Sequence, residues 1–354
     1  MIIGNCLVKD QIVSIEIIGE KIKRIGTFEG KWDLDARGKR VIPGLVDIHI
    51  HGAYGYDTMN GDFREISTYL AAHGTTSFCP TTMTASREAL RSVTEKSTEV
   101  PGAEILGFHL EGPFIAASRK GAQDGTQIRP ASMEEFDTYP NVRMITVAPE
   151  TEGCLQFIKA ASRKCAVALG HTDADYEMAK KAFENGANGL THTFNAMPPL
   201  LNRNSGPVGA AIDCNAYAQV IVDGLHVEKA CVLMLYRTLG PDRVILISDS
   251  IQIGGMPDGS YVVGNVDVTV KNGIARVADG HLAGSTATLL ECVKTAVSFG
   301  IPFEDAVKMA SETPAKAIGI TNKGKLSEGY DADLVLLNDD LSVDTVMIRG
   351  KAVR

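Results

Sequence analysis

The feature of the sequence that most limits its fold is a series of eight short apolar runs, most of them followed by a helix-like stretch. The runs span residues 41–50, 75–80, 105–110, 142–148, 166–170, 189–194, 218–222 and 244–247. Continuous apolar runs are typical of parallel strands that are covered on both faces. Eight strand–helix units predict a TIM-like (β/α)8 barrel. A doubly wound sheet is the main alternative, because periodicity alone does not separate the two.

Both ends of the chain have a different pattern, in which short β-like runs alternate with turns. Residues 12–18 and 333–337 are examples. We therefore expect residues 1–42 and 325–354 to pair into one small β-sandwich domain, and residues 43–324 to form the barrel.

One segment inside the barrel region, residues 254–280, also breaks the pattern. It contains alternating valines followed by Asn272-Gly273. Asn-Gly between alternating runs is a strong hairpin signal, so we expect a β-hairpin insertion after the eighth strand.

The composition limits the class of partner. The formal net charge of −8 disfavours nucleic acid and anionic membrane surfaces, and no basic run is long enough to override it. No stretch has the length and apolar character of a membrane span or a signal peptide. The seven cysteines are scattered and form no C-x-x-C pair, which is typical of reduced thiols. We expect a cytoplasmic protein that acts on a small molecule.

Five of the eight runs end in side chains that bind metals or carry protons. The carboxyl ends of barrel strands form one face, so residues far apart in sequence converge there. His49 and His51 are two residues apart on one strand and project to the same side, where both can bind one metal. Histidines that merely pack or hydrogen-bond are the alternative, but the position of this pair before Gly52, at a strand end, favours ligands.

A second group combines one carboxylate and two imidazoles, Glu111, His171 and His192. This is a common catalytic set for a divalent metal. Asp249 ends the eighth run, where an aspartate is either a metal ligand or a proton shuttle. For the acidic residues, capping or a salt bridge is the structural alternative. His109 shares a strand face with Glu111, and for it we expect a role in the core.

Basic side chains near the same face can bind an anionic substrate despite the negative net charge. Arg203 lies in a Pro- and Asn-rich loop after the sixth run, and His226 follows the seventh. Arginine is suited to bidentate phosphate binding. For either residue alone, a solvated surface position explains the sequence equally well. Arg119 and Lys120 are weaker candidates.

Taken in order, these motifs resemble N-acetylglucosamine-6-phosphate deacetylases of the amidohydrolase superfamily, over nearly the whole chain. The motifs are Pro43-Gly44-Leu45-Val46-Asp47-Ile48-His49-Ile50-His51-Gly52, His109-Leu110-Glu111-Gly112-Pro113-Phe114, Gly170-His171-Thr172, Thr191-His192-Thr193-Phe194-Asn195-Ala196-Met197, Asp223-Gly224-Leu225-His226, Ser248-Asp249 and Leu282-Ala283-Gly284-Ser285. H-L-E-G-P followed by T-H-x-x-N-A-M is specific, whereas H-x-H-G alone indicates only the superfamily.

The resemblance implies a TIM-like barrel enzyme, usually a homodimer, that hydrolyses the acetamide of N-acetyl-D-glucosamine 6-phosphate in amino-sugar catabolism. It implies one or two divalent metals per subunit, zinc or iron first and manganese, cobalt or nickel after them. The implied ligands are Glu111, His171 and His192 for the main metal and His49 and His51 for a second. Asp249 corresponds to the catalytic acid/base.

The resemblance also implies a set of substrate-binding residues. These are Asn195, Ala196, Arg203 and His226 for the sugar phosphate, and Leu282 and Ala283 for the acetyl side. Gln123 stands where many members have a histidine that polarises the acetyl carbonyl, and we expect its amide to replace that donor. Ser250-Ile251-Gln252-Ile253 replaces the frequent A-M-A-A. Because of these two departures, the sequence does not determine which sugar is the substrate.

Three other functions fit parts of the pattern. A deacetylase for N-acetylgalactosamine 6-phosphate differs only in the sugar 4-hydroxyl. A cyclic-amide hydrolase generally uses a carboxylated lysine as a metal bridge, where the third run here offers Glu111. A non-catalytic scaffold with the same fold would have lost ligands that are all present in this chain.

Overall fold

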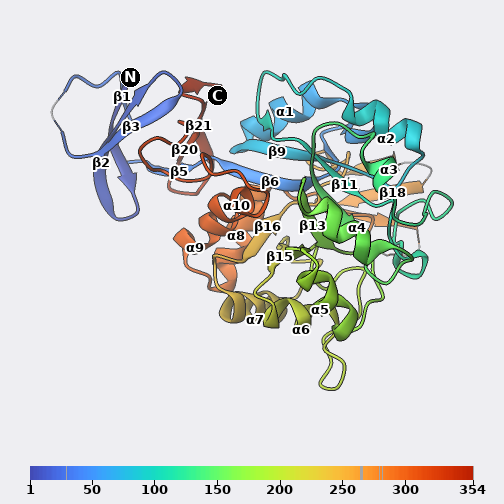
Figure 1. Ribbon diagram of the computed structural model, residues 1–354. Helices are drawn as coiled ribbons and strands as arrows, with labels where there is room; N and C mark the ends of the chain where they lie inside the picture. Colours follow the sequence, from blue (N-terminus) through green and yellow to red (C-terminus); the bar gives the residue numbers. More distant parts are fainter. Residues whose placement is uncertain (29, 264–265, 279, 281, 354) are drawn as a thin grey trace.

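The computed structural model describes residues 1–354 except 29, 264–265, 279, 281 and 354. Its main body is a ring of parallel strands with helices outside it, and a smaller sheet lies at one side (Figure 1). The ring consists of β6 (Leu45–Ile50), β9 (Thr75–Thr82), β11 (Phe108–Glu111), β12 (Val142–Val147), β13 (Ala166–Leu169), β14 (Gly189–Leu190), β15 (Tyr217–Ile221) and β16 (Val244–Ile247). A short β10 (Glu104–Ile105) pairs with β9 ahead of β11.

The first and last strands of the ring are neighbours. The backbone N–H of Asp249, just after β16, donates to the oxygen of His49 on β6 at 3.0 Å. A doubly wound open sheet would keep its first and last strands apart, so the predicted TIM-like barrel is confirmed. Val46, Ile48, Ile245 and Ile247 belong to the apolar cluster that fills the barrel.

The helices that cover the barrel are mostly amphipathic and short. They are α1 (Phe63–Ala72), α2 (Arg87–Thr94), α3 (Met133–Phe136), α4 (Cys154–Ala161), α5 (Tyr176–Glu184), α6 (Gly206–Asp213), α7 (Lys229–Leu239), α8 (Leu289–Phe299), α9 (Phe303–Met309) and α10 (Glu312–Ala317), with 3-10 turns η1 (Thr58–Asn60) and η2 (Ala117–Arg119). Within the described residues, no helix has the length and apolar character needed to cross a membrane.

Both ends of the chain pair into one eight-stranded sheet, as predicted. Its strands are β1 (Ile2–Val8), β2 (Gln11–Ile18), β3 (Lys21–Gly26), β4 (Leu34–Asp35), β5 (Arg40–Pro43), β20 (Leu334–Leu337), β21 (Val343–Ile348) and β22 (Lys351–Ala352). The first apolar run is therefore divided, because β5 joins this sheet and only β6 enters the barrel. Gly44 lies at the division, where an added Cβ would come within 2.1 Å of Thr76 Oγ1.

A buried ammonium group connects the small sheet to the barrel. Lys323 is 4% exposed. Its Nζ lies 2.8 Å from Asp333, 2.9 Å from Asp331 and 2.8 Å from Glu104 of β10. Removing one partner of such a network leaves an uncompensated buried charge, so the contact favours a fixed placement of the two parts.

The segment between β16 and α8 contains a separate antiparallel sheet. Its strands are β17 (Gly259–Val263), β18 (Val266–Lys271) and β19 (Ile274–Val277), one strand more than a hairpin. Asn272 and Gly273 have φ of +52° and +72° and form the turn between β18 and β19. A further short pair, β7 (Gly52–Ala53) and β8 (Tyr56–Asp57), follows the first barrel strand.

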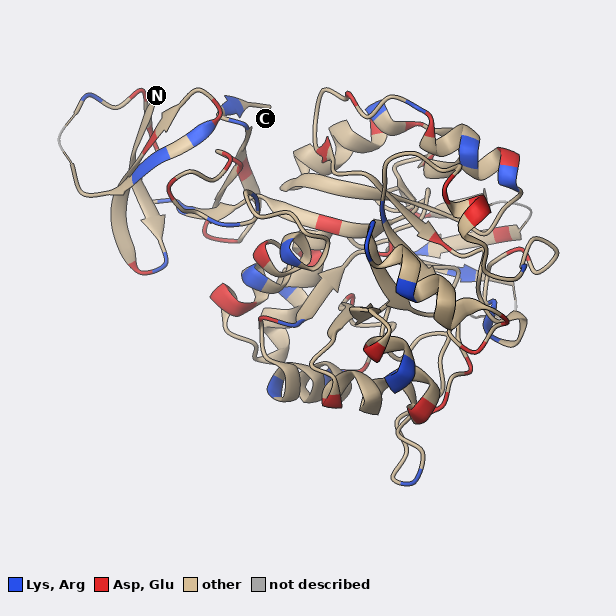
Figure 2. Ribbon diagram, viewed as in Figure 1, with Lys and Arg blue, Asp and Glu red and all other residues tan. Residues whose placement is uncertain are grey.

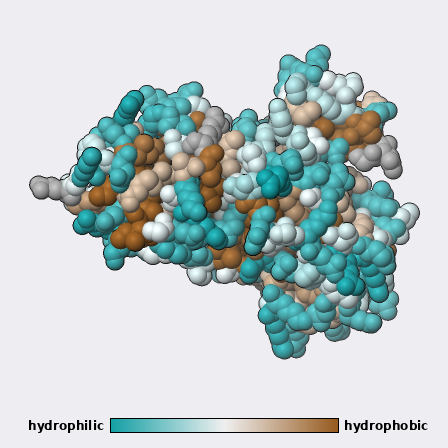
Figure 3. All heavy atoms as spheres, turned by 90° about the horizontal axis from the view of Figure 1, so that it is seen from above, coloured by the Kyte–Doolittle hydropathy of each residue, from teal (hydrophilic) through white to brown (hydrophobic). Residues whose placement is uncertain are grey.

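Charged and apolar residues are mixed over the surface. Figure 2 shows Lys and Arg interspersed with Asp and Glu along the outer helices. From above, apolar residues form separate patches between hydrophilic ones (Figure 3). The most exposed large apolar side chains include Ile12, Ile18, Tyr54, Leu201 and Val262.

Candidate metal centre and active site

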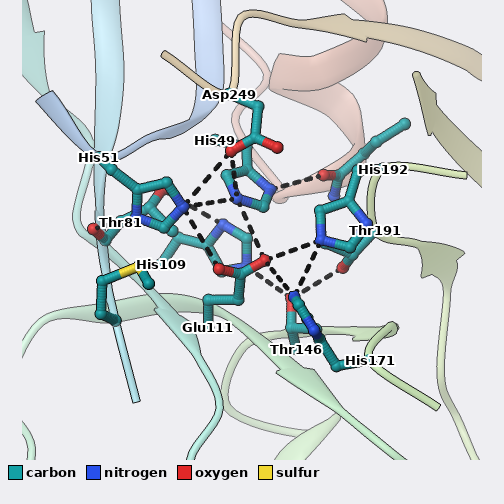
Figure 4. A network of polar contacts seen from close by, with 12 residues as sticks. His49, His51, Thr81, His109, Glu111, Thr146, His171, Thr191, His192 and Asp249 are labelled. Carbon is teal, nitrogen blue, oxygen red and sulfur yellow. Dashed lines mark hydrogen bonds and ion pairs between the residues drawn. The ribbon is translucent and has the colours of Figure 1, made fainter. Parts of the chain in front are cut away.

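Six of the predicted functional side chains lie close together at the carboxyl ends of the barrel strands (Figure 4). They fall into two groups that can each hold a metal ion, His49 with His51 and Asp249, and Glu111 with His171 and His192. His49 is in β6 and Glu111 in β11, and the other four residues directly follow β6 or lie in the turns after β13, β14 and β16. The convergence follows from the barrel, because all its strands end at the same face.

Each of the four histidines uses its Nδ1 atom to contact an oxygen outside the cluster. The partners are the side-chain oxygen of Gln219 for His49 (3.4 Å) and the backbone oxygens of Thr81 for His51 (3.1 Å), Arg119 for His171 (2.8 Å) and Asn195 for His192 (3.2 Å). A carbonyl oxygen only accepts, so each Nδ1 carries the proton. All four Nε2 lone pairs therefore face the centre, as in histidines that bind metals.

The spacing of the inward-facing atoms fits a metal ion. His171 Nε2 and His192 Nε2 are 3.1 Å apart, and Glu111 Oε1 lies 3.1 and 2.9 Å from them. Ligands around a tetrahedral ion with bonds of ~2.1 Å are ~3.4 Å apart. Two bare imidazole lone pairs this close repel each other unless a cation lies between them, so the donor set fits a divalent metal.

The second group has a similar spacing and shares Glu111. His49 Nε2 and His51 Nε2 are 3.3 Å apart, and Asp249 Oδ1 lies 3.3 and 3.4 Å from them. Glu111 Oε1 is 3.4 Å from His49, and its Oε2 is 3.3 Å from His51. The carboxylate of Glu111 is therefore placed between the two groups.

The charge states of these groups suit a bound cation. Burial raises the pKa of Asp249, but His49 and His51 oppose it and bring the pKa to about 2. Burial lowers the pKa of His49 to about 4. Burial also lowers the pKa of His51, yet Asp249 and Glu111 outweigh it and raise the pKa to about 10. The two carboxylates thus attract positive charge at His51 Nε2, which either a proton or a metal ion can supply, and a bound metal ion would take the place of that proton.

His109 lies below the centre and does not offer a free ring nitrogen. Its Nδ1 is 3.1 Å from the oxygen of Ile48, and its Nε2 is 2.7 Å from Thr146 Oγ1. Thr146 in turn contacts Thr191 at 2.7 Å (Figure 4). Both nitrogens are used in the core, which matches the role expected from the sequence.

Gln123 has a different position from the one expected. Its Nε2 donates to Glu111 Oε2 at 2.5 Å, and its Oε1 accepts from the Thr84 N–H at 2.6 Å. Both ends of the amide are therefore directed at Glu111 and the backbone, and not at a substrate carbonyl.

The other predicted substrate residues lie on loops around the barrel face. Asn195 Nδ2 is buried and has no hydrogen-bond partner among the described residues, and Ala196 has a φ of +51°. His226 Nδ1 donates to Asp223 Oδ2 at 2.6 Å. The backbone N–H of Ala283, which follows Leu282, donates to Ala275 of β19 at 3.0 Å.

Arg203 is not brought to the metal centre. It lies in an exposed turn closed by a hydrogen bond of 3.0 Å from the Leu201 N–H to the Asn204 oxygen. This part of the chain, between α5 and α6, projects away from the barrel (Figure 1).

Two features of the site were not predicted from the sequence. Gln219 is 2% exposed on β15, and a polar residue within an apolar run could have indicated a partner for a ligand. His171, His192 and Asp249 have φ of +48°, +28° and +47°. Positive φ is uncommon for residues other than glycine and occurs often at functional sites, but it has no simple sequence signal.

Comparisons with known proteins agree with this geometry. A model of the amidohydrolase family matches residues 40–353. The chain is similar to N-acetylglucosamine-6-phosphate deacetylase of Vibrio furnissii, at 37% identity over 98% of this chain and 91% of that protein. It is also similar to N-acetylgalactosamine-6-phosphate deacetylase of Escherichia coli O157:H7, at 35% identity over 87% and 86%.

The chain is also similar to solved structures of such deacetylases. A mutant N-acetyl-D-glucosamine-6-phosphate deacetylase of Mycobacterium smegmatis, in complex with N-acetyl-D-glucosamine-6-phosphate, has a TM-score of 0.91 at 32% identity and covers 100% of this chain and 99% of its own. The N-acetylglucosamine-6-phosphate deacetylase of Thermotoga maritima has a TM-score of 0.90 at 32% identity, with the same coverage.

Proposed function

Because the chain belongs to the amidohydrolase family, in the branch of the N-acetylglucosamine-6-phosphate deacetylases, we propose that it hydrolyses the acetamide of N-acetyl-D-glucosamine 6-phosphate. The products are D-glucosamine 6-phosphate and acetate, in amino-sugar catabolism. The observation that carries this proposal is the set of four Nε2 atoms that surround Glu111, with Asp249 beside them. The Mycobacterium smegmatis complex with this sugar phosphate supports the substrate.

We assign the main metal position to Glu111, His171 and His192, and a second position to His49 and His51. A bound divalent ion supplies Lewis acidity, which lowers the pKa of water and polarises the acetyl carbonyl. Zinc or iron is the proposed ion, with manganese, cobalt and nickel as alternatives, because His/Glu sites accept all of these.

Asp249 is the proposed proton carrier. Its low pKa keeps the carboxylate ionised, so Oδ1 can accept a proton from the attacking water. The same oxygen then donates that proton to the sugar nitrogen as the C–N bond breaks. One water is consumed, its oxygen is kept in acetate, and the amine leaves protonated.

The proposed substrate contacts use polar groups that can form a further hydrogen bond. Asn195 Nδ2, which is buried and has no partner in the described part of the chain, can donate to a phosphate or sugar oxygen. His226 is oriented by Asp223, which leaves its Nε2 for the ligand. Ala196 lies beside Asn195, and Leu282 and Ala283 are assigned to the acetyl side.

We also propose a cytoplasmic homodimer. The exposed turn that carries Arg203 includes Leu201, which is 54% exposed, and this turn can reach a second copy of the chain. The seven cysteines are free thiols, as expected for a reducing compartment.

Arg203→Ala is expected to raise KM for the phosphorylated sugar about tenfold to a hundredfold, the value of one charge-assisted bidentate contact. It should change kcat/KM for the unphosphorylated N-acetyl sugar little, because that sugar has no group for the arginine to bind. Steady-state kinetics with both sugars and both proteins measures this. Equal impairment with both sugars would remove Arg203 from the phosphate site.

A second candidate substrate is N-acetyl-D-galactosamine 6-phosphate. The similarity to the Escherichia coli O157:H7 deacetylase for that sugar favours it, at nearly the identity of the glucosamine relatives. Acetate release from the two epimers, compared as kcat/KM, distinguishes them. A higher value for the galacto epimer would replace the proposed substrate without changing the proposed chemistry.

A further inference from the structure

The segment that begins with η2 after β11, residues 117–126, is an exposed loop with one buried residue. Of residues 117–126, eight are exposed and Arg119 is intermediate, whereas Gln123 is 3% exposed. A single buried side chain in an exposed loop acts as an anchor, so its contacts determine where the loop lies.

The anchor and one backbone oxygen of this loop both contact proposed ligands of the main metal. Gln123 Nε2 donates to Glu111 Oε2 at 2.5 Å. The backbone oxygen of Arg119 accepts the Nδ1 proton of His171 at 2.8 Å. The same two ligands also contact each other, Glu111 Oε1 and His171 Nε2 being 3.1 Å apart.

A further tether of the loop lies at the surface and is weaker. Arg119 Nε pairs with Asp173 at 2.5 Å, but both side chains are more than a third exposed, at 38% and 39%. Exposed ion pairs contribute little to stability because water and salt screen them. The buried tethers of the loop are therefore the contacts to Glu111 and His171, together with the bond of 2.6 Å from the Thr84 N–H to Gln123 Oε1.

We propose that residues 117–126 form a metal-coupled loop, in which Gln123 is a positioning residue that acts through Glu111. A cation at Glu111 and His171 fixes both side chains and makes the Nδ1–H of His171 a stronger donor to Arg119. If metal binding favours this position of the loop by a given factor, then holding the loop in this position increases the metal affinity by the same factor, because the coupling of two equilibria is reciprocal. The proposal rests on the metal position assigned above, but it does not depend on the identity of the sugar.

Limited trypsin digestion of the full chain measures the coupling, because Lys120 is exposed in the loop. Zinc is removed by chelation and then added back, and cleavage after Lys120 is followed by mass spectrometry. Lys9, in an exposed turn of the small sheet, is the reference bond. Zinc should slow cleavage after Lys120 roughly tenfold and leave cleavage after Lys9 nearly unchanged. Equal slowing at both bonds, or no slowing at Lys120, would overturn the coupling.

Variants of the loop provide the second measurement, with Gln127→Ala as the matched control. Gln127 directly follows the loop, and its side-chain Nε2 donates to Thr126 Oγ1 at 3.4 Å. In the zinc-loaded protein, Gln123→Ala should speed cleavage after Lys120 and raise the Kd for zinc, each roughly tenfold. Gln123→Glu should raise the Kd further, since it places a second carboxylate against Glu111.

The control variant should change neither quantity. An unchanged zinc Kd in Gln123→Ala, or an equal change in Gln127→Ala, contradicts the positioning role. If acetate release persists in that case, the proposed function stands and only the coupling fails.

Discussion

Asp249→Asn is expected to lower kcat by about 10²- to 10⁴-fold, the usual contribution of a positioned proton carrier. Asparagine has nearly the same size but cannot accept the proton of water or return it to the leaving nitrogen. Asp249 contacts His49 and His51, and its carboxylate is not part of the group formed by Glu111, His171 and His192. The main metal should therefore remain bound.

Acetate release and metal content of the same preparation measure both parts of this prediction. Asp175→Asn is the matched control, because Asp175 caps α5 outside the barrel and asparagine is an equally good cap. Near-normal turnover in Asp249→Asn would exclude the proton-carrier role. Loss of all bound metal would show instead that Asp249 is required for the main site.

His192→Ala is expected to remove both the main metal and the activity. The proposed site has three protein ligands, and His192 Nε2 lies 2.9 Å from Glu111 Oε1 and 3.1 Å from His171 Nε2. Removing one of three ligands leaves two, and metal affinity then falls steeply. Metal analysis and acetate release should both approach the background.

His73→Ala is the control, since His73 ends α1 outside the barrel and contacts the Tyr69 oxygen at 2.7 Å. It should keep both metal and activity. His49→Ala should retain the main metal and cost less activity if the second position is auxiliary. Full occupancy in His192→Ala would remove this histidine from the ligand set.

The barrel and the convergence of its polar residues could be predicted because each depends on local pattern. Continuous apolar runs indicate strands covered on both faces, and a parallel barrel brings their ends together. The division of the first run at Gly44 was not predicted, because the apolar pairs Val41-Ile42 of β5 and Leu45-Val46 of β6 are alike in sequence but pair with different strands. β5 pairs with β20 and β6 pairs with β9, and this difference is determined by tertiary packing.

The contacts of Gln123 and Arg203 could not be predicted for a related reason. Both residues lie on loops, and the sequence pattern does not specify the path of a loop's backbone. Gln123 folds back onto Glu111, whereas the turn of Arg203 extends into solvent. The Nδ1 atoms of the proposed metal-binding histidines mostly contact backbone oxygens, and because every residue has such an oxygen, no sequence signal identifies the partner.

The most direct test of the central claim is acetate release from N-acetyl-D-glucosamine 6-phosphate by one preparation in three states: as purified, after chelation and after zinc or iron is restored. The metal-dependent deacetylase predicts acetate and D-glucosamine 6-phosphate in equal amounts, loss of both after chelation, and recovery with the ion. Acetate release that is unaffected by complete metal removal would contradict the account, as would a metal-loaded protein that releases no acetate from this sugar or its galacto epimer.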